Sequence, residues 1–451
     1  MTLPPSLEAI LTFLQNWWVE IVCGVVIVAV VPLIAGYVVL VERKLMADMQ
    51  ARLGPMRVGP HGLLQPIADA LKLLIKEDLI PDNADKLIFW LAPVISMVAA
   101  MTSMGAIAFG PTFQVARDIN VGILFVIGVS SLGLLGIILG GWASNSHYSI
   151  IGAIRSTAQL VSYETAAGLA IVGALLLAGT LRIRAIVDAQ QQLGVWFIFL
   201  TPVAFFIYLV ASIAETNRAP FDLPEAESEL VAGYMTEYSG FRWSLYFLGE
   251  YANMIVVGSV ATTLFLGGWL RPFPNVHWLD GLDFLPPLII AAVGVYCVYR
   301  AGKQPAEIQI WFMWAVALTC FAVAVIFAVP LFVTSLKFIL PGLHGAFWFL
   351  LKVSGYIYLF MWLRFTLPRY RFDQLMHLGW YILIPLAIVN VLAIGVAMIL
   401  ESEFGWNRWF AALLTSLFTL GIAAFLVNLY DKRTDAASSP ATAAARDPYA
   451  G

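Results

Sequence analysis

Charged side chains are scarce in this sequence of 451 residues. Asp, Glu, Lys and Arg make up 12% of the chain, about half of the share that is usual in soluble globular domains. Hydrophobic residues make up 61%, and they gather in long blocks. This composition excludes an ordinary soluble protein and indicates an integral membrane protein.

Cysteine and the common cofactor motifs are also lacking. Cys23, Cys297 and Cys320 lie far apart, each in an apolar block, where a cysteine is usually a small buried hydrophobic residue. The sequence has no clustered cysteines for zinc or iron–sulfur binding and no GxGxxG or GxxxxGK[ST] nucleotide loop. We therefore expect no metal site and no cofactor on this chain, and any redox carriers belong to partner subunits.

A removable signal peptide is not expected either. The start, MTLPPSLEAILTF, has neither a basic segment nor a small-residue cleavage site. The first apolar block is therefore interpreted as a membrane anchor.

About eleven apolar blocks are long enough to cross a bilayer, which takes about 20 helical residues. Lipid offers no hydrogen-bond partners to the backbone, so we expect an all-α polytopic transmembrane helix bundle over residues 1–430. The blocks lie near 19–41, 87–109, 121–140, 158–181, 196–214, 246–268, 284–300, 309–333, 346–364, 380–400 and 409–429.

The basic residues predict an orientation, because Lys and Arg gather in cytoplasmic loops. With the N-terminus outside, eighteen fall in inward loops and the tail, six fall in outer loops, and Lys352 lies in a span, which accounts for all 25. This bias places the tail, residues 431–451, in the cytoplasm. Its Ala/Ser/Pro-rich composition predicts disorder.

Three long inward loops are expected to hold most of the polar residues: Glu42–Lys86, Gly141–Gln159 and Glu215–Leu245. In the first, Gly-Pro turns precede apolar residues at helical spacing, which indicates an amphipathic helix at the inner membrane surface. This helix either braces the protein on the membrane or forms the wall of an entrance for an amphipathic ligand. Its apolar residues are Leu63, Leu64, Ile67, Leu71, Leu74 and Ile75.

Three glutamates lie inside apolar spans, all toward the predicted inner side: Glu164, Glu215 and Glu250. An ionisable group in the bilayer costs about 2.5–3.5 kcal/mol even on the lenient insertion scale. One such residue is readily explained as a paired structural charge, for example Glu164 with Arg155. Three on separate spans at one depth favour a proton relay.

The third loop, ETNRAPFDLPEAESELVAGYMTEYSG, is the most acidic segment of the chain. Asp222 and Glu225 have the spacing of a capping box, so a helix start explains them in part. Asp222, Glu225 and Glu229 share one helical face, where like charges raise each other's pKa. The capping box does not explain Glu227, Glu229 and Glu237, and Arg218 is the nearest counter-charge.

Several long runs resemble one family, the H subunit of bacterial NADH:quinone oxidoreductase (complex I), which is the counterpart of mitochondrial NADH dehydrogenase subunit 1. The resemblance covers about residues 15–270 and 346–400. The runs that carry it are ERKLMADMQARLGPMRVGPHGLLQPIADALKLLIKED (42–78), GWASNSHYSIIGAIRSTAQLVSYE (141–164), ETNRAPFDLPEAESELVAGYMTEYSG (215–240), EYANM (250–254), LFLGGW (264–269) and WLRFTLPRYRFDQLMHLGW (362–380).

The resemblance implies a membrane subunit, with no redox cofactor of its own, that forms a quinone chamber and couples quinone reduction to proton pumping. It implies contacts with a peripheral iron–sulfur subunit, neighbouring membrane subunits and lipids, and none with nucleic acid. The chamber residues implied are Glu42, Arg43, Arg52, Gly54, Asp69, Arg218, Phe221, Asp222 and Glu225. The acidic channel implied consists of Glu164, Glu215, Glu229 and Glu250, with Glu227 and Glu237 nearby.

The sequence departs from the family's usual eight spans in two places. Residues 270–345 add a helical pair, and residues 404–429 add a C-terminal helix. Two other functions are compatible with a membrane helix bundle that carries these carboxylates: the paralogous subunit of a membrane-bound hydrogenase complex, and a free-standing proton-coupled transporter. The intact first-loop and third-loop runs favour the quinone enzyme.

Overall fold

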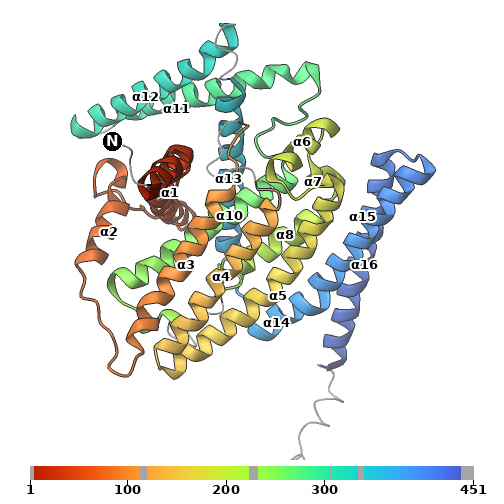
Figure 1. Ribbon diagram of the computed structural model, residues 1–451, viewed down its shortest axis with the longest axis horizontal. Coiled ribbons are helices and arrows are strands. Elements are labelled where there is room, and N and C mark those ends of the chain that lie inside the picture. The colour runs from red at the N-terminus through yellow and green to blue at the C-terminus, as the bar shows by residue number, and fades with distance from the viewer. Residues whose placement is uncertain (1–4, 112–118, 223–231, 304–306, 334–339, 438–451) are drawn as a thin grey trace, which may run out of the picture.

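The computed structural model describes residues 5–111, 119–222, 232–303, 307–333, 340–437 (Figure 1). Glu225, Glu227 and Glu229 lie outside these residues. The elements are α1 (Pro5–Met49), η1 (Pro60–Gly62), α2 (Gln65–Ile75), α3 (Lys86–Ala106), α4 (Gly122–Ala143), α5 (His147–Ala178), α6 (Ile183–Leu193), α7 (Phe197–Leu200), α8 (Pro202–Glu215), η2 (Gly233–Met235), α10 (Gly240–Phe265), η3 (His277–Phe284), α11 (Leu285–Ala301), α12 (Glu307–Phe332), α13 (Leu340–Thr366), α14 (Phe372–His377), η5 (Leu378–Leu383), α15 (Ile384–Phe404) and α16 (Arg408–Ala437).

The predicted all-α membrane bundle is confirmed. Among the described residues, 10 helices are long and apolar enough to cross a membrane. The block expected at 196–214 is divided at Thr201, where φ −132° and ψ 59° break the helix into α7 and α8. Pro202 then begins α8, because proline lacks the backbone N–H that a continuing helix would need. At 14 residues, α8 is shorter than the other spans.

The second inward loop was predicted too long. Helix α4 ends at Ala143 and α5 begins at His147, so most of residues 141–159 are helical. The polar residues that suggested a loop, Ser156 and Gln159, are fully buried on α5, where they face other parts of the protein. Helix α16 likewise continues to Ala437, so the expected disordered tail cannot begin at residue 431.

Helix α10 forms the centre of the bundle. Within its most apolar 18-residue stretch 83% of the residues are buried, more than in the corresponding stretch of any other candidate span among the described residues, whereas the figure is 17% for α11 and α12 and 11% for α16. Protein surrounds α10, so its polar side chains find partners there and need not face lipid. Figure 1 shows α11 and α12 side by side along one edge, and α15 and α16 paired on another.

The amphipathic helix predicted in the first loop is confirmed as α2. None of its residues is buried, and its apolar side chains Ile67, Leu71 and Leu74 are exposed. It lies beside α1 and α10. An exposed apolar face on a helix too polar to span a membrane is typical of a helix at the membrane surface.

Candidate functional site

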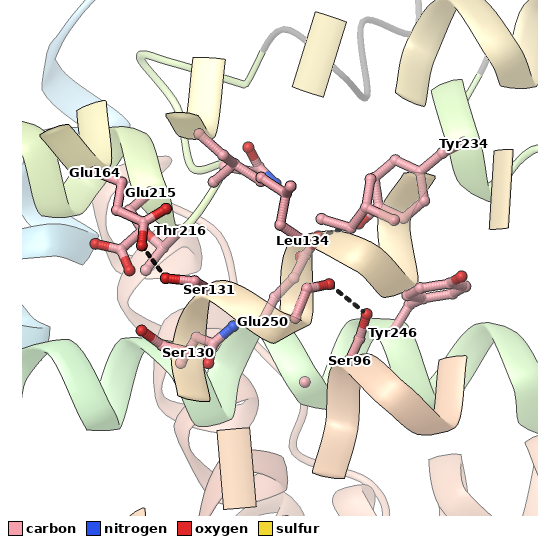
Figure 2. A pocket seen from close by; sticks show the side chains of 16 residues that line it. Ser96, Ser130, Ser131, Leu134, Glu164, Glu215, Thr216, Tyr234, Tyr246 and Glu250 are labelled. Carbon is pink, nitrogen blue, oxygen red and sulfur yellow. Dashed lines mark hydrogen bonds between the residues drawn. The ribbon is translucent and has the colours of Figure 1, made fainter. Parts of the chain in front are cut away.

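Three half-buried glutamates from three helices line one cavity of about 60 Å³. Glu164 lies on α5, Glu215 ends α8, and Glu250 lies on α10. Figure 2 shows Glu164 and Glu215 next to each other at one end and the rings of Tyr234 and Tyr246 at the other. The volume is enough for roughly four water molecules. The sequence predicted one depth for the three glutamates, and the structure places them around one cavity.

Polar side chains from neighbouring elements support these carboxylates. The Ser131 hydroxyl of α4 donates a hydrogen bond to Glu164, and the Tyr234 hydroxyl donates one to Glu250 Oε1 at 3.0 Å. The guanidinium of Arg218 lies 3.6 Å from Glu250 Oε2, and both side chains are almost buried. The carboxylates and hydroxyls can exchange protons with one another and with water in the cavity.

The remaining polar lining comes from α3, α4, α10 and the segment after α8. The lining residues with polar side chains, besides the glutamates and tyrosines, are Ser96, Ser130, Ser131, Thr216, Asn217 and Asn253. Behind the cavity wall, Tyr238 stacks on Phe89 with 4.1 Å between ring centroids. Burial raises the pKa of Tyr238 to about 12, so this phenol stays neutral at physiological pH.

Gln159 of α5 holds the start of the third loop in place. Its amide nitrogen donates to the backbone oxygens of Ala214 and Phe221, both at 2.8 Å. Asn217 adopts a left-handed conformation with φ 50°, which asparagine tolerates better than most residues. The chain reverses direction at Asn217, so that Arg218 packs against the helices, where it is 7% exposed.

A line of charged and aromatic contacts leads away from Glu250. The Arg218 guanidinium lies 4.0 Å from the ring centroid of Tyr251 and donates to its hydroxyl at 3.3 Å. The same hydroxyl donates to Glu42 Oε2 on α1 at 2.8 Å. Arg364 of α13 forms an ion pair with Glu42. Five side chains from four parts of the chain thus form one connected network.

A second, mainly apolar cavity of about 140 Å³ adjoins the network, because Arg43, the residue after Glu42 on α1, is part of its lining. It lies between α1, α2 and α10 and is lined by residues such as Leu40, Leu73 and Phe247. Its polar side holds the ion pair between Arg43 Nη1 and Asp69 Oδ2 at 2.7 Å. The site therefore combines an apolar cavity, a charged network and an acidic cavity in that order.

The predicted chamber residues divide into two groups. Glu42, Arg43, Asp69 and Arg218 lie at the network or at the apolar cavity. Phe221 is buried outside both and stacks on Tyr370. Arg52 is exposed and bonds to Gln50, and Gly54 packs on the backbone of Lys44. Asp222 is half-buried, and its carbonyl accepts a hydrogen bond from Arg369.

The predicted channel residues also divide. Glu164, Glu215 and Glu250 line the acidic cavity, while half-buried Glu237 does not. Within the described part of the chain, no ion pair joins Glu164 to Arg155, whose guanidinium lies over the Phe372 ring at 5.8 Å. A Glu164–Arg155 pair therefore does not explain Glu164.

Sequence reasoning missed Arg364, Ser131 and Tyr234. An arginine at the predicted inner end of a span is what the orientation rule leads one to expect, so nothing marked Arg364 as the partner of Glu42. Serines are common in membrane helices and carry no charge to reveal a partner. Only the crossing of α4 with α5 places Ser131 against Glu164.

The fold and the site define a multi-pass membrane protein with an internal acidic cavity linked to an apolar one. The chain belongs to the NADH dehydrogenase family, whose match covers residues 21–302 and 306–395. These residues include α11 and α12 and stop within α15, before α16.

Similar proteins carry one name. The chain is 51% identical over 387 residues to NADH-quinone oxidoreductase H subunit 2 of Solibacter usitatus, covering 84% of this chain and 96% of that protein. It is 52% identical over 365 residues to H subunit 1 of the same enzyme in Koribacter versatilis, covering 77% and 84%. It is 42% identical over 393 residues to the H subunit of Thermomicrobium roseum, covering 84% and 95%. The family resemblance predicted from the sequence is confirmed.

Proposed function

We propose that the chain binds a quinone in a chamber entered from the lipid and couples its reduction to proton translocation in a respiratory complex I. The connection between the two cavities carries this proposal. The contacts run without a gap from Glu42 through Tyr251 and Arg218 to Glu250. The relatives' name, the H subunit of NADH-quinone oxidoreductase, supports quinone as the ligand.

The apolar cavity suits the tail of an amphipathic quinone. It lies between α1, α10 and the membrane-surface helix α2, so a molecule dissolved in lipid reaches it without crossing water. The Arg43–Asp69 pair and the neighbouring Glu42 provide polar partners for a head group at its inner side. Arg52, Gly54, Phe221, Asp222 and Glu225 are proposed members of the same chamber on the family motif.

The charged network links a change at the head group to the acidic cavity. Quinone reduction consumes protons and changes the charge of a poorly hydrated site, where electrostatic interactions are strong. A shift of Arg218 between Tyr251 and Glu250 would alter the electrostatic surroundings of the cavity's carboxylates. Glu227, Glu229 and Glu237 remain proposed members of the channel on the family motif, in addition to the three glutamates that line the cavity.

In this proposal the flavin and the iron–sulfur clusters belong to partner subunits, and the electrons reach the quinone from a peripheral subunit. The inner ends of α1, α8 and α13, which carry Glu42, Glu215 and Arg364, face the cytoplasm. This orientation rests on the distribution of Lys and Arg along the sequence.

Glu215→Gln tests the coupling role while keeping the size and polarity of the side chain. We expect NADH:quinone activity of the assembled complex to fall at least about tenfold, because the variant cannot take up a proton at this position. NADH oxidation by an artificial acceptor should not change, because that reaction does not involve the membrane site.

Glu403→Gln is the matched control, since Glu403 is exposed at the far end of α15. The proposal is wrong if Glu215→Gln and Glu250→Gln both retain full quinone-linked activity and proton pumping. Loss of the artificial-acceptor reaction as well would instead indicate a defect in assembly.

A further inference from the structure

Lys352 is a half-buried cation within a span, and the proposed function does not use it. It lies in α13, and its ammonium nitrogen donates to three backbone oxygens of the turn that follows α10. The distances are 2.6 Å to Leu266, 2.9 Å to Gly268 and 2.5 Å to Leu270. The ring centroid of Trp196 lies 4.2 Å from the same nitrogen.

Two glycines shape this turn. Gly267 and Gly268 have φ 75° and 53°, a conformation that glycine adopts without strain. A Cβ on Gly267 would lie 2.4 Å from Trp196 Cδ1, and one on Gly268 would lie 2.6 Å from Val187. The turn is therefore closely packed, with its carbonyl oxygens directed at one point and Trp196 closing the side.

The charge of Lys352 is compensated without a carboxylate. Among the described residues no ion pair includes Lys352, although burying an unpaired ammonium costs several kcal/mol. Three charge-assisted hydrogen bonds, the negative end of the α10 dipole and the Trp196 ring offset this cost. Oxygen ligands and an aromatic face are the surroundings that recognise an ammonium ion.

We propose that Trp196 and the carbonyls of Leu266, Gly268 and Leu270 form an ammonium-binding cage, which we call the carbonyl cage. Lys352 is its tethered ligand. By holding the end of α10, the ammonium fixes the axial position of this helix, which carries Glu250 and Tyr251. Lys352 is thus a positioning residue for the acidic cavity, and this consequence for activity rests on the proposed function.

Chemical rescue of Lys352→Ala tests the carbonyl cage in the assembled complex. The substitution removes three carbons and the ammonium nitrogen, which n-propylammonium replaces. We expect Lys352→Ala to lower the midpoint of thermal inactivation by about 5 °C or more. Added n-propylammonium should restore the midpoint and the NADH:quinone activity in a saturable manner. Detergent-purified complex is required, because amines collapse proton gradients across vesicles.

Three comparisons make the rescue specific. Propanol fills the same space without charge, and tetramethylammonium carries charge without an N–H donor, so neither should rescue the variant. Wild-type complex should not respond to n-propylammonium. Lys303→Ala, at an exposed lysine after α11, should keep the wild-type midpoint and show no amine response.

Equal rescue by propanol would overturn the proposal, because filling the empty space without a charge would then be sufficient. Absence of any rescue by n-propylammonium would overturn it too. If Lys352→Ala does not assemble, Lys352→Met carries the test, since it keeps the length of the side chain without the charge. A wild-type midpoint for Lys352→Met would refute a cage for ammonium. If n-propylammonium restores the thermal midpoint of the variant but the wild-type complex has no quinone-linked activity, the result contradicts the proposed function and leaves the carbonyl cage intact.

Discussion

Arg364→Met removes the arginine that compensates Glu42 while keeping much of the side-chain volume. Glu42 is 7% exposed and Arg364 is 31% exposed at their side chains. Breaking a buried ion pair by removing one partner costs about 3–5 kcal/mol, because the remaining charge stays buried. Tyr251 still donates to Glu42 at 2.8 Å, and Arg364 is partly hydrated, so we expect about 3 kcal/mol.

The double variant Glu42→Gln with Arg364→Met isolates the electrostatic part of this cost. Glutamine removes the unpaired charge and still accepts a hydrogen bond from Tyr251. We therefore expect the double variant to be more stable than Arg364→Met alone, with a coupling energy of about 2 kcal/mol. If the stability losses of the two single variants simply add up to that of the double variant, the two side chains do not interact.

The rate of thermal inactivation of the purified complex provides the assay. Each variant is normalised to its own starting activity, so that a change in catalysis is not counted as a change in stability. At about 1.4 kcal/mol for each factor of ten, Arg364→Met should lose activity up to about 100-fold faster. Additivity of the single and double variants within about 0.5 kcal/mol would refute the network centred on Glu42.

Two further predictions concern the first loop and the assembly. Burial, followed by the nearby Lys44 and Arg300, lowers the pKa of His61, so the folded state binds fewer protons there and loses stability as the pH falls below about 6.5. His61→Asn, which suits the left-handed φ of 52°, should reduce the drop in thermal midpoint between pH 7.5 and 5.5, and an unchanged drop would exclude His61 as its source. On affinity purification of the tagged chain, we expect subunits that contain flavin and iron–sulfur clusters to co-purify. A chain that purifies alone would favour a transporter. A nickel-containing partner would favour the hydrogenase paralogue.

Much of the fold could be predicted because membrane helices are set by a simple physical requirement. A run of about 20 apolar residues must span as a helix, so hydropathy located the spans. Hydropathy does not locate helices correctly where protein replaces lipid as the surroundings. Ser156 and Gln159 are polar yet buried on α5, and Thr201 breaks a block that hydropathy treats as continuous.

The site was predictable only in its charged members. A carboxylate in a span is costly, so Glu164, Glu215 and Glu250 stood out in the sequence. Their shared cavity depends on how α5, α8 and α10 cross, and no residue pattern encodes that crossing. Lys352 was recognisable as a charge within a span, but its ligands are backbone oxygens and leave no signature in the side chains.

The ratio of protons pumped to electrons transferred shows whether quinone chemistry is coupled to the acidic cavity. It is measured in vesicles that contain the purified complex, first with wild type and then with Glu215→Gln at matched rates of NADH oxidation. We expect the residual quinone-linked electron transfer of Glu215→Gln to pump fewer protons per electron than the wild type, with Glu403→Gln unchanged. A wild-type ratio in Glu215→Gln would contradict a coupling role for the cavity.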